Sequence, residues 1–154
     1  MARVQLALNV SDVDAAVDFY SKVFATEPAK RRPGYANFAI TEPPLKLVLI
    51  EGEPDQATVL DHLGVEVATT DEVTEATKRL AGLGLATVEE NDTTCCYAVQ
   101  DKVWVHGPGE EPWEVYTVKA DAPDATSINP AGETGSCDCG SPTSQSGGPL
   151  PACC

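Results

Sequence analysis

A short strand-like pattern occurs twice in this chain. Residues 4–10 (Val-Gln-Leu-Ala-Leu-Asn-Val) match residues 61–67 (Asp-His-Leu-Gly-Val-Glu-Val) in alternating apolar with polar or small side chains. A period of two predicts a β-strand with one packed face and one roomier face. Gln5 and His62, which can both bind a metal, occupy the same place on the roomier face. The repeat therefore indicates a metal site shared by two related parts of the chain.

The residues after the first repeat predict one helix and several strands. Residues 11–14 are typical of a helix start, and an apolar stripe follows at helical spacing, formed by Val13, Ala16, Val17, Tyr20 and Phe24. Proline and glycine then interrupt the chain before two predicted strands at 35–40 and 45–51, with room for a short strand around 29–32. This half predicts a βαβββ unit.

The second half repeats this order. Residues 70–72 predict a helix start, with an apolar stripe at Val73, Ala76, Thr77 and Leu80 and an end at Gly82 and Gly84. Strands are predicted at 86–90, 97–105 and 113–118, with connectors at 91–96 and 107–112. The fold class is therefore α+β, with paired βαβββ modules at about 1–56 and 57–119 that form a curved mixed sheet cup.

The composition changes after residue 119. Residues 121–154 are dominated by Gly, Pro and Ser and contain no aromatic residue, Lys or Arg. Such a segment cannot bury enough apolar surface to offset its ordering entropy. We therefore predict a domain at 1–119 and a disordered tail at 120–154. The tail carries Cys137, Cys139, Cys153 and Cys154, which resemble scavenging sites for soft metals; the alternative is a solvated appendage that turnover does not need.

The net charge of −14 limits the partners of the chain. It argues against nucleic acid and anionic membranes, because both would repel an acidic protein. No apolar run approaches the roughly 20 residues of a membrane span, and no signal peptide is evident. We expect a cytoplasmic monomer or homodimer whose cysteines are mostly thiols.

A third candidate ligand lies on the last strand of the second module. Aligning the two modules through Pro44 and Pro112 places Glu114 in the cup beside Gln5 and His62, with Lys46 at its counterpart position. A Lys ammonium cannot coordinate a cation. The pattern therefore predicts three ligands, which form a variant of the facial triad of non-haem Fe(II) oxygenases with Gln in place of one His. Each of the three alone is more often structural, so the prediction depends on their convergence. His106 is expected at an exposed rim.

The adjacent residues Cys95 and Cys96 are the second functional signal. Their Cα atoms are about 3.8 Å apart, which is too close for an unstrained disulfide. Two thiolates on an accessible loop would chelate a soft centre such as As(III), Cd(II) or Zn(II). The alternative is a pair of small buried residues. The polar residues at 92–94 favour the accessible loop.

Residues 1 to about 119 resemble the vicinal oxygen chelate superfamily of glyoxalases, extradiol dioxygenases and antibiotic-resistance proteins. The turn at 107–109 before Trp-Glu-Val at 113–115 resembles its final-strand motif, in which the Glu is a metal ligand. The match is closest to organoarsenical C–As lyases and related cadmium-induced proteins. It is carried by residues 32–38 (Arg-Pro-Gly-Tyr-Ala-Asn-Phe), 60–64 (Leu-Asp-His-Leu-Gly), 89–92 (Glu-Glu-Asn-Asp), 95–97 (Cys-Cys-Tyr) and 100–105 (Gln-Asp-Lys-Val-Trp-Val).

This resemblance implies an Fe(II)-dependent dioxygenase that detoxifies arsenic by cleaving the carbon–arsenic bond of methylarsenite or trivalent aromatic arsenicals. It implies Fe(II), or another divalent metal in its place, on Gln5, His62 and Glu114, with dioxygen as co-substrate. Cys95 and Cys96 would hold the arsenic, and the products would be arsenite and, from a methyl group, formaldehyde. Pocket-lining candidates are Tyr97, Lys102, Trp104 and Tyr116.

Three other functions stay open at this point. One is a non-enzymatic cadmium- or arsenic-binding stress protein that acts through its cysteines. Another is a glyoxalase-like isomerase or thiol transferase; the Lys at position 46 disfavours the isomerase, and neither activity needs Cys95 and Cys96. A drug-sequestering dimer of the bleomycin type would need no metal.

Overall fold

The computed structural model describes residues 2–95, 97–122, 127–128 and 134–135. The elements follow the order β1(Arg3–Val10), α1(Val13–Phe24), β2(Lys30–Arg32), β3(Tyr35–Ile40), β4(Leu45–Glu51), β5(Val59–Glu66), α2(Thr70–Gly82), β6(Val88–Cys95), β7(Ala98–His106) and β8(Pro112–Asp121). Each module is therefore a βαβββ unit, as predicted. Two short strands, β9(Ser127–Ile128) and β10(Thr134–Gly135), pair with each other, and β9 lies beside β6.

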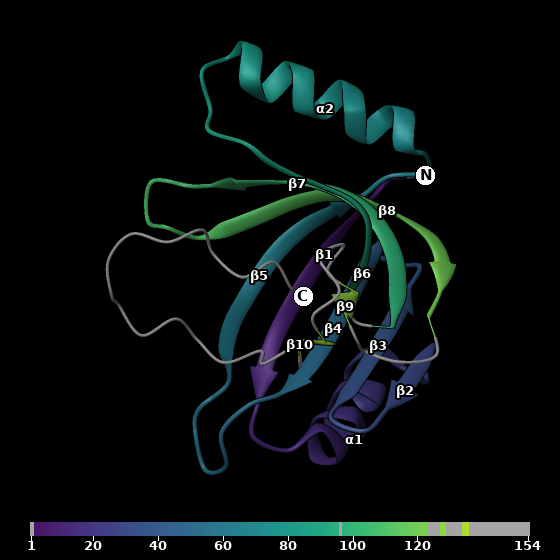
Figure 1. Ribbon diagram of the computed structural model, residues 1–154. Coiled ribbons are helices and arrows are strands. Elements are labelled where there is room, and N and C mark those ends of the chain that lie inside the picture. The colour runs from purple at the N-terminus through teal and green to yellow at the C-terminus, as the bar shows by residue number, and fades with distance from the viewer. Residues whose placement is uncertain (1, 96, 123–126, 129–133, 136–154) are drawn as a thin grey trace.

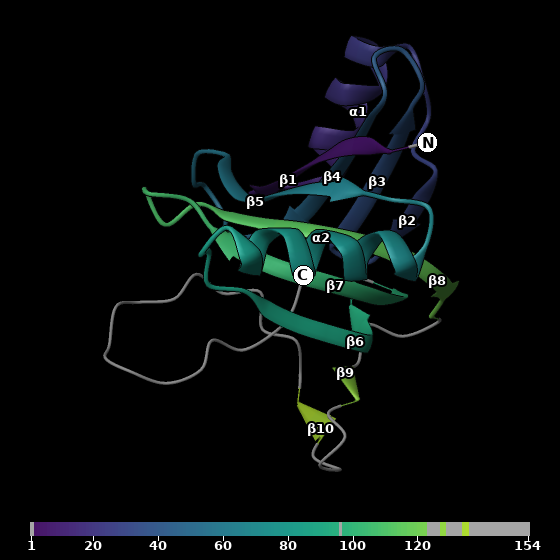
Figure 2. The same ribbon diagram turned by 90° about the horizontal axis from the view of Figure 1, so that it is seen from above.

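The strands β1 to β8 form one sheet with the order β2-β3-β4-β1-β5-β8-β7-β6. β1 and β5 pair antiparallel at its centre, and each pairs in parallel with the last strand of its own module, β4 or β8. This order is symmetric about the β1/β5 pair, so an approximate twofold axis relates the modules. The sheet curls around a concave face, which we call the cup, and both helices lie outside it (Figure 1, Figure 2).

α1 covers the outer face of the first module. Asp12 caps the helix by accepting a hydrogen bond from the backbone nitrogen of Ala15 at 2.9 Å, which satisfies one of the free donors at a helix start. The apolar stripe then packs against strands β1, β3 and β4 in a cluster of Val10, Val13, Val17, Phe38, Leu47 and Leu49. The predicted stripe is confirmed, and burying its side chains holds α1 on the sheet.

α2 contacts β7 and β8 on the outer face of the second module. Its cap is Thr69, one residue before the predicted start, in a capping box with Glu72. Val73, Ala76 and Thr77 are buried, as the predicted stripe requires. Neither helix of the described chain is long and apolar enough to cross a membrane.

The strand β6 corrects one prediction. It extends to Cys95 and includes most of the expected connector at 91–96, because the chain keeps pairing with β7 beyond a register shift between Glu90 and Thr93. Such an irregularity lets a polar segment remain in a sheet while one residue is left out of the ladder. Cys95 consequently lies on a strand that the sheet holds in place.

β8 reaches Asp121, two residues beyond the predicted end of the domain. Most of the predicted tail, including its four cysteines, lies outside the described residues, and its disorder stays a prediction. The eight strands that build the cup all come from one chain.

Candidate metal centre

The central strands bring three distant side chains to one point of the cup. Gln5 on β1 pairs with Gly64 on β5, and Gly64 also pairs with Glu114 on β8. A Cβ atom on Gly64 would lie 3.1 Å from Glu114 Cγ and 3.3 Å from both Gln5 Cβ and Tyr116 Cε1. The absence of a side chain at Gly64 therefore allows its neighbours to meet above it.

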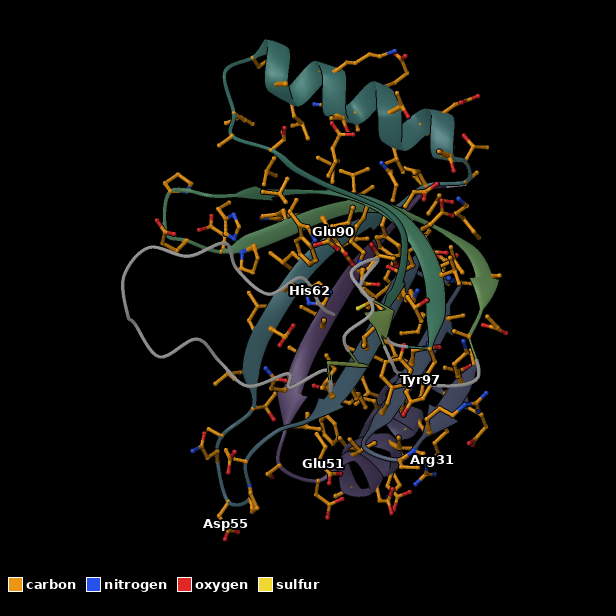
Figure 3. The ribbon with its side chains drawn as sticks, in the orientation of Figure 1. Arg31, Glu51, Asp55, His62, Glu90 and Tyr97 are labelled. Carbon is orange, nitrogen blue, oxygen red and sulfur yellow. The ribbon has the colours of Figure 1, made fainter. Side chains whose placement is uncertain are left out.

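Gln5, His62 and Glu114 form a close triangle of polar atoms. Gln5 Nε2 donates to Glu114 Oε1 at 2.7 Å and lies 2.9 Å from His62 Nε2, and His62 Nε2 lies 3.3 Å from Glu114 Oε1. The three residues are 4%, 3% and 2% exposed. Figure 3 shows His62 inside the curl of the sheet. The three ligands predicted from the sequence thus lie together and inward.

This donor set fits a divalent metal. Three ligands bound at about 2.1 Å and near right angles are about 3 Å apart. The triangle, whose Gln5 corner is occupied by the amide nitrogen Nε2, has sides of 2.7–3.3 Å. Among the described residues, no three His, Cys, Asp or Glu side chains gather as a metal site. The amide of Gln5 is therefore needed to complete a set of three.

The surroundings of the triangle favour positive charge at the imidazole. Burial opposes a charged His62, but hydrogen bonds to Asp61 and Glu114 outweigh it and raise the pKa of His62 to about 9. Asp61 Oδ1 lies 2.6 Å from His62 Nδ1, and Asn9 donates to the other Asp61 oxygen at 2.8 Å. A carboxylate on Nδ1 leaves Nε2 directed at the triangle, which is the usual support for a metal-binding histidine.

Lys102 keeps the candidate ligand Glu114 ionised. Burial opposes a charged Glu114, but the Lys102 charge and the His62 contact lower the pKa of Glu114 to about 2. Lys102 Nζ lies 2.9 Å from Glu114 Oε2 and 5.2 Å from the centre of the Trp104 ring. The Trp104 ring also meets His62 edge-on at 5.5 Å between centroids. Lys102 and Trp104, two predicted pocket residues, therefore adjoin the triangle.

Tyr116 connects the triangle to a group of charged residues. Its hydroxyl makes a short hydrogen bond with Gln5 Oε1 and lies 2.9 Å from Glu66 Oε2. Arg3 contacts both Glu66 oxygens at 3.1–3.2 Å, and Lys46 Nζ lies 3.4 Å from Oε2. Burial and the charges of Glu66 and Glu114 raise the pKa of Tyr116, so its hydroxyl keeps its proton.

The strand register corrects the predicted counterpart of Glu114. The repeat that matches Gln5 with His62 also matches Ala7 with Gly64, and the two helix caps, Asp12 and Thr69, keep the same spacing along the chain. Ala7 pairs with Val48 where Gly64 pairs with Glu114, and Val48, two residues beyond Lys46, is therefore the counterpart. The proline alignment was wrong by two residues. It still gave the right face, because side chains alternate with a period of two.

The prediction that Cys95 lies on an accessible loop was wrong, because Cys95 is part of a buried strand. It is the last residue of β6 and is 1% exposed. Tyr97 follows with a left-handed backbone (φ 65°), and its ring packs 5.5 Å from that of Tyr35, on the cup side of the first module. Cys96 lies outside the described residues. His106 is exposed at the end of β7, and the predicted rim position is confirmed.

Glu90 is a site residue that the sequence did not reveal. It pairs with Lys102 across the β6/β7 ladder, and its buried Oε2 has no hydrogen-bond partner among the described residues. Burial raises the pKa of Glu90, the Lys102 charge and a Trp104 hydrogen bond oppose that rise, and the charges of Cys95 and Glu114 add to it. The Cys95 thiol and the metal-ligand candidate Glu114 therefore both lie within electrostatic range of one carboxyl group.

Comparisons with known proteins show the family and the fold of this chain. The sequence profile of the "Glyoxalase/Bleomycin resistance protein/Dioxygenase superfamily" matches residues 3–115. A trivalent organoarsenical cleaving enzyme of Thermomonospora curvata is 71% identical over 122 residues, which cover 79% of this chain and 81% of that protein. The cadmium-induced protein CadI of Mycobacterium tuberculosis is 62% identical, covering 79% and 80%. An extradiol ring-cleaving dioxygenase from B. fuscum has the same fold, with a TM-score of 0.58 at 21% identity over 78% of this chain and 33% of that one.

Proposed function

Because this chain belongs to the glyoxalase/bleomycin resistance/dioxygenase superfamily, we propose that it is an Fe(II)-dependent dioxygenase that cleaves the carbon–arsenic bond of trivalent organoarsenicals and so detoxifies arsenic. The observation that carries the proposal is the 71% identity to the Thermomonospora enzyme over 122 residues, which cover 79% of this chain. The converging triangle of Gln5, His62 and Glu114 supports the metal-dependent part.

Gln5, His62 and Glu114 would hold the metal. One amide oxygen, one imidazole and one carboxylate form a mixed oxygen and nitrogen set that suits Fe(II) and accepts other divalent cations. When bound, Fe(II) supplies the activation of dioxygen, which no side chain provides. The chain itself keeps Glu114 ionised through Lys102 and orients His62 through Asp61.

Cys95 and Cys96 would hold the substrate through arsenic. Each thiol loses its proton as an arsenic–sulfur bond forms, and that proton leaves as water with a hydroxyl group from the trivalent arsenic. Two bonds to one arsenic atom fix it in place and convert an encounter into a held geometry. The burial of Cys95 adds exclusion of water from the bound group. For Cys96, which lies outside the described residues, this role rests on the sequence.

The remaining pocket residues would confine the carbon group. Trp104 and Tyr97 present aromatic surface around the cup, and Glu90 lies opposite Lys102 in the β6/β7 ladder. A carboxyl group with an unpartnered buried oxygen can take the proton from a thiol and pass it to the hydroxyl group that leaves arsenic as water. The predicted cytoplasmic location and the monomeric or dimeric state stay predictions.

The direct test is aerobic turnover of methylarsenite by iron-loaded protein, with arsenite release and oxygen consumption measured together. We expect one arsenite for each dioxygen consumed and no arsenite in anaerobic buffer. Cys95→Ser should raise the substrate concentration needed for half-maximal rate by at least about tenfold, because one of two arsenic–sulfur bonds is lost. Arsenite release at an unchanged rate without oxygen would contradict the proposal.

A second candidate is a non-enzymatic cadmium or arsenic binder, which the similarity to the cadmium-induced protein favours. It predicts stoichiometric binding of soft cations through cysteines and indifference to His62→Ala. The glyoxalase-like alternative is weakened further by the register, because Val48 supplies no fourth ligand at the counterpart of Glu114.

A further inference from the structure

The Gln5 side chain presents the wrong atom to the metal site. Its Nε2 lies at the triangle, 2.9 Å from His62 Nε2 and 2.7 Å from Glu114 Oε1. An amide nitrogen is a hydrogen-bond donor, and amide groups ligate metals through oxygen. A half-turn of the terminal amide exchanges the two atoms without moving the rest of the side chain. Metal binding at this triangle therefore requires the amide to turn.

The opposite end of the amide determines what that turn costs. The Tyr116 hydroxyl contacts both Gln5 Oε1 and Glu66 Oε2, yet a hydroxyl carries one proton and can donate to only one of these acceptors. With Gln5 Oε1 facing Tyr116, the Tyr116 hydroxyl donates its hydrogen bond to Gln5 Oε1. After the turn, Gln5 Nε2 faces the hydroxyl oxygen and donates to it, and the Tyr116 hydroxyl, still protonated, donates its hydrogen bond to Glu66 Oε2 at 2.9 Å.

Tyr116 is therefore a partner for both amide orientations, and the fold holds it in place for this role. Its side chain is fully buried, and Lys46 Nζ lies 5.0 Å from its ring centre. Glu66 is held by Arg3 and Lys46, whose charges keep it an anionic acceptor. Without this hydroxyl, a turned amide would direct its Nε2 at an apolar ring edge and leave a buried donor without an acceptor, which disfavours the turned orientation.

We propose that Tyr116, with Glu66 as its hydrogen-bond acceptor, is a positioning residue that lets Gln5 direct its amide oxygen at the metal. The proposal rests on the metal centre of the proposed function. The predicted ligand set thus depends on a group of residues, Arg3–Glu66–Tyr116–Gln5, that starts on β1, crosses to β5 and β8, and returns to β1.

The test is the affinity of the full chain for Mn(II), measured by the electron paramagnetic resonance signal of the free ion. Mn(II) prefers oxygen and nitrogen donors, so the cysteines compete little for it. Tyr116→Phe should weaken Mn(II) binding about 10- to 100-fold, the usual effect of losing an outer partner of a ligand. Tyr35→Phe is the matched control, because its hydroxyl lies in the same cup and accepts a hydrogen bond from Asn37. It should bind Mn(II) like the unaltered protein.

A second background separates amide orientation from simple packing. In Gln5→Glu, the terminal carboxylate has two equivalent oxygens, so a half-turn of the group does not change the atom that faces the metal. Tyr116→Phe should therefore weaken Mn(II) binding by less than about threefold in that background, against 10- to 100-fold beside Gln5. Glu66→Gln should also weaken binding in the unaltered background, because an amide at 66 can donate to Tyr116 and favour its return to Gln5 Oε1.

The outcomes are distinct. Equal Mn(II) affinity of Tyr116→Phe and Tyr35→Phe would overturn the positioning role and leave the proposed function standing. Equal losses beside Gln5 and in the Gln5→Glu background would also overturn it, since the hydroxyl would then act independently of the amide. Absence of Mn(II) binding by the unaltered protein would overturn the metal centre and the proposed function with it.

Discussion

The two modules have the same topology, but they line the cup with different chemistry. The first module contributes a mostly apolar wall of Ala7, Tyr35, Val48 and Ile50, with Gln5 as its one candidate ligand. The second contributes buried polar and charged groups, namely His62, Lys102, Glu114 and Tyr116. A twofold-symmetric sheet can therefore hold an asymmetric site, because symmetry fixes the backbone positions and leaves the side chains independent.

The largest difference in Mn(II) affinity between corresponding variants of the two modules is expected at the symmetry-related positions 114 and 48. Glu114→Ala should weaken Mn(II) binding at least about 100-fold, because it removes a charged ligand and leaves Lys102 without its ion pair. Val48→Ala removes only apolar contacts and should cost about 1–3 kcal/mol of unfolding free energy. Metal titration and urea unfolding of both variants separate the two effects. Comparable Mn(II) losses in both would show that the modules contribute alike.

A smaller difference in Mn(II) affinity is expected between variants of Gly64 and Ala7, which occupy corresponding positions in the two modules. Gly64→Ala places a methyl group 3.1–3.3 Å from Glu114, Gln5 and Tyr116, so it should weaken Mn(II) binding about tenfold by displacing them. Ala7→Gly removes a buried methyl group from the first module and should cost about 1–2 kcal/mol of stability. Its Mn(II) affinity should stay within about threefold of the unaltered protein. Equal affinity in Gly64→Ala would mean that the close approach is not required.

The smallest effect concerns the charges that join the modules. Burial opposes ionised Glu66, but Lys46, Tyr116 and Arg3 together lower the pKa of Glu66 below 4.5. A lowered carboxyl pKa contributes stability that is present above pH 4.5 and is lost as the pH falls through the folded-state value. The unfolding free energies of metal-free protein and Glu66→Gln should therefore differ most near neutral pH.

Urea unfolding at several pH values checks this prediction. The difference between the two proteins should narrow as the pH falls from about 7 to about 3. Lys46→Met removes one of the cations that lower the pKa of Glu66 and should make the narrowing smaller. A difference that stayed constant over this range would contradict a stabilising role for ionised Glu66.

Much of the site followed from local sequence, because side-chain alternation along a strand is a local property. Gln5, His62 and Glu114 could be assigned to one face of the sheet before their strands were paired. The βαβββ order, the stripe of α1 and the exposed position of His106 were predictable for the same reason. The family resemblance added the chemistry that residue patterns alone leave open.

Register and burial required the tertiary structure. Pairing between distant strands made Val48, and not Lys46, the counterpart of Glu114, and an irregularity in β6 placed Cys95 in the buried sheet. Strand pairing also placed Glu90 beside Lys102 and Tyr116 beside Glu66. The sequence by itself determined which face each ligand occupies, since that depends on a period of two. Only the fold decided how far along each strand they meet, because that is set by hydrogen-bond ladders between segments far apart in the chain.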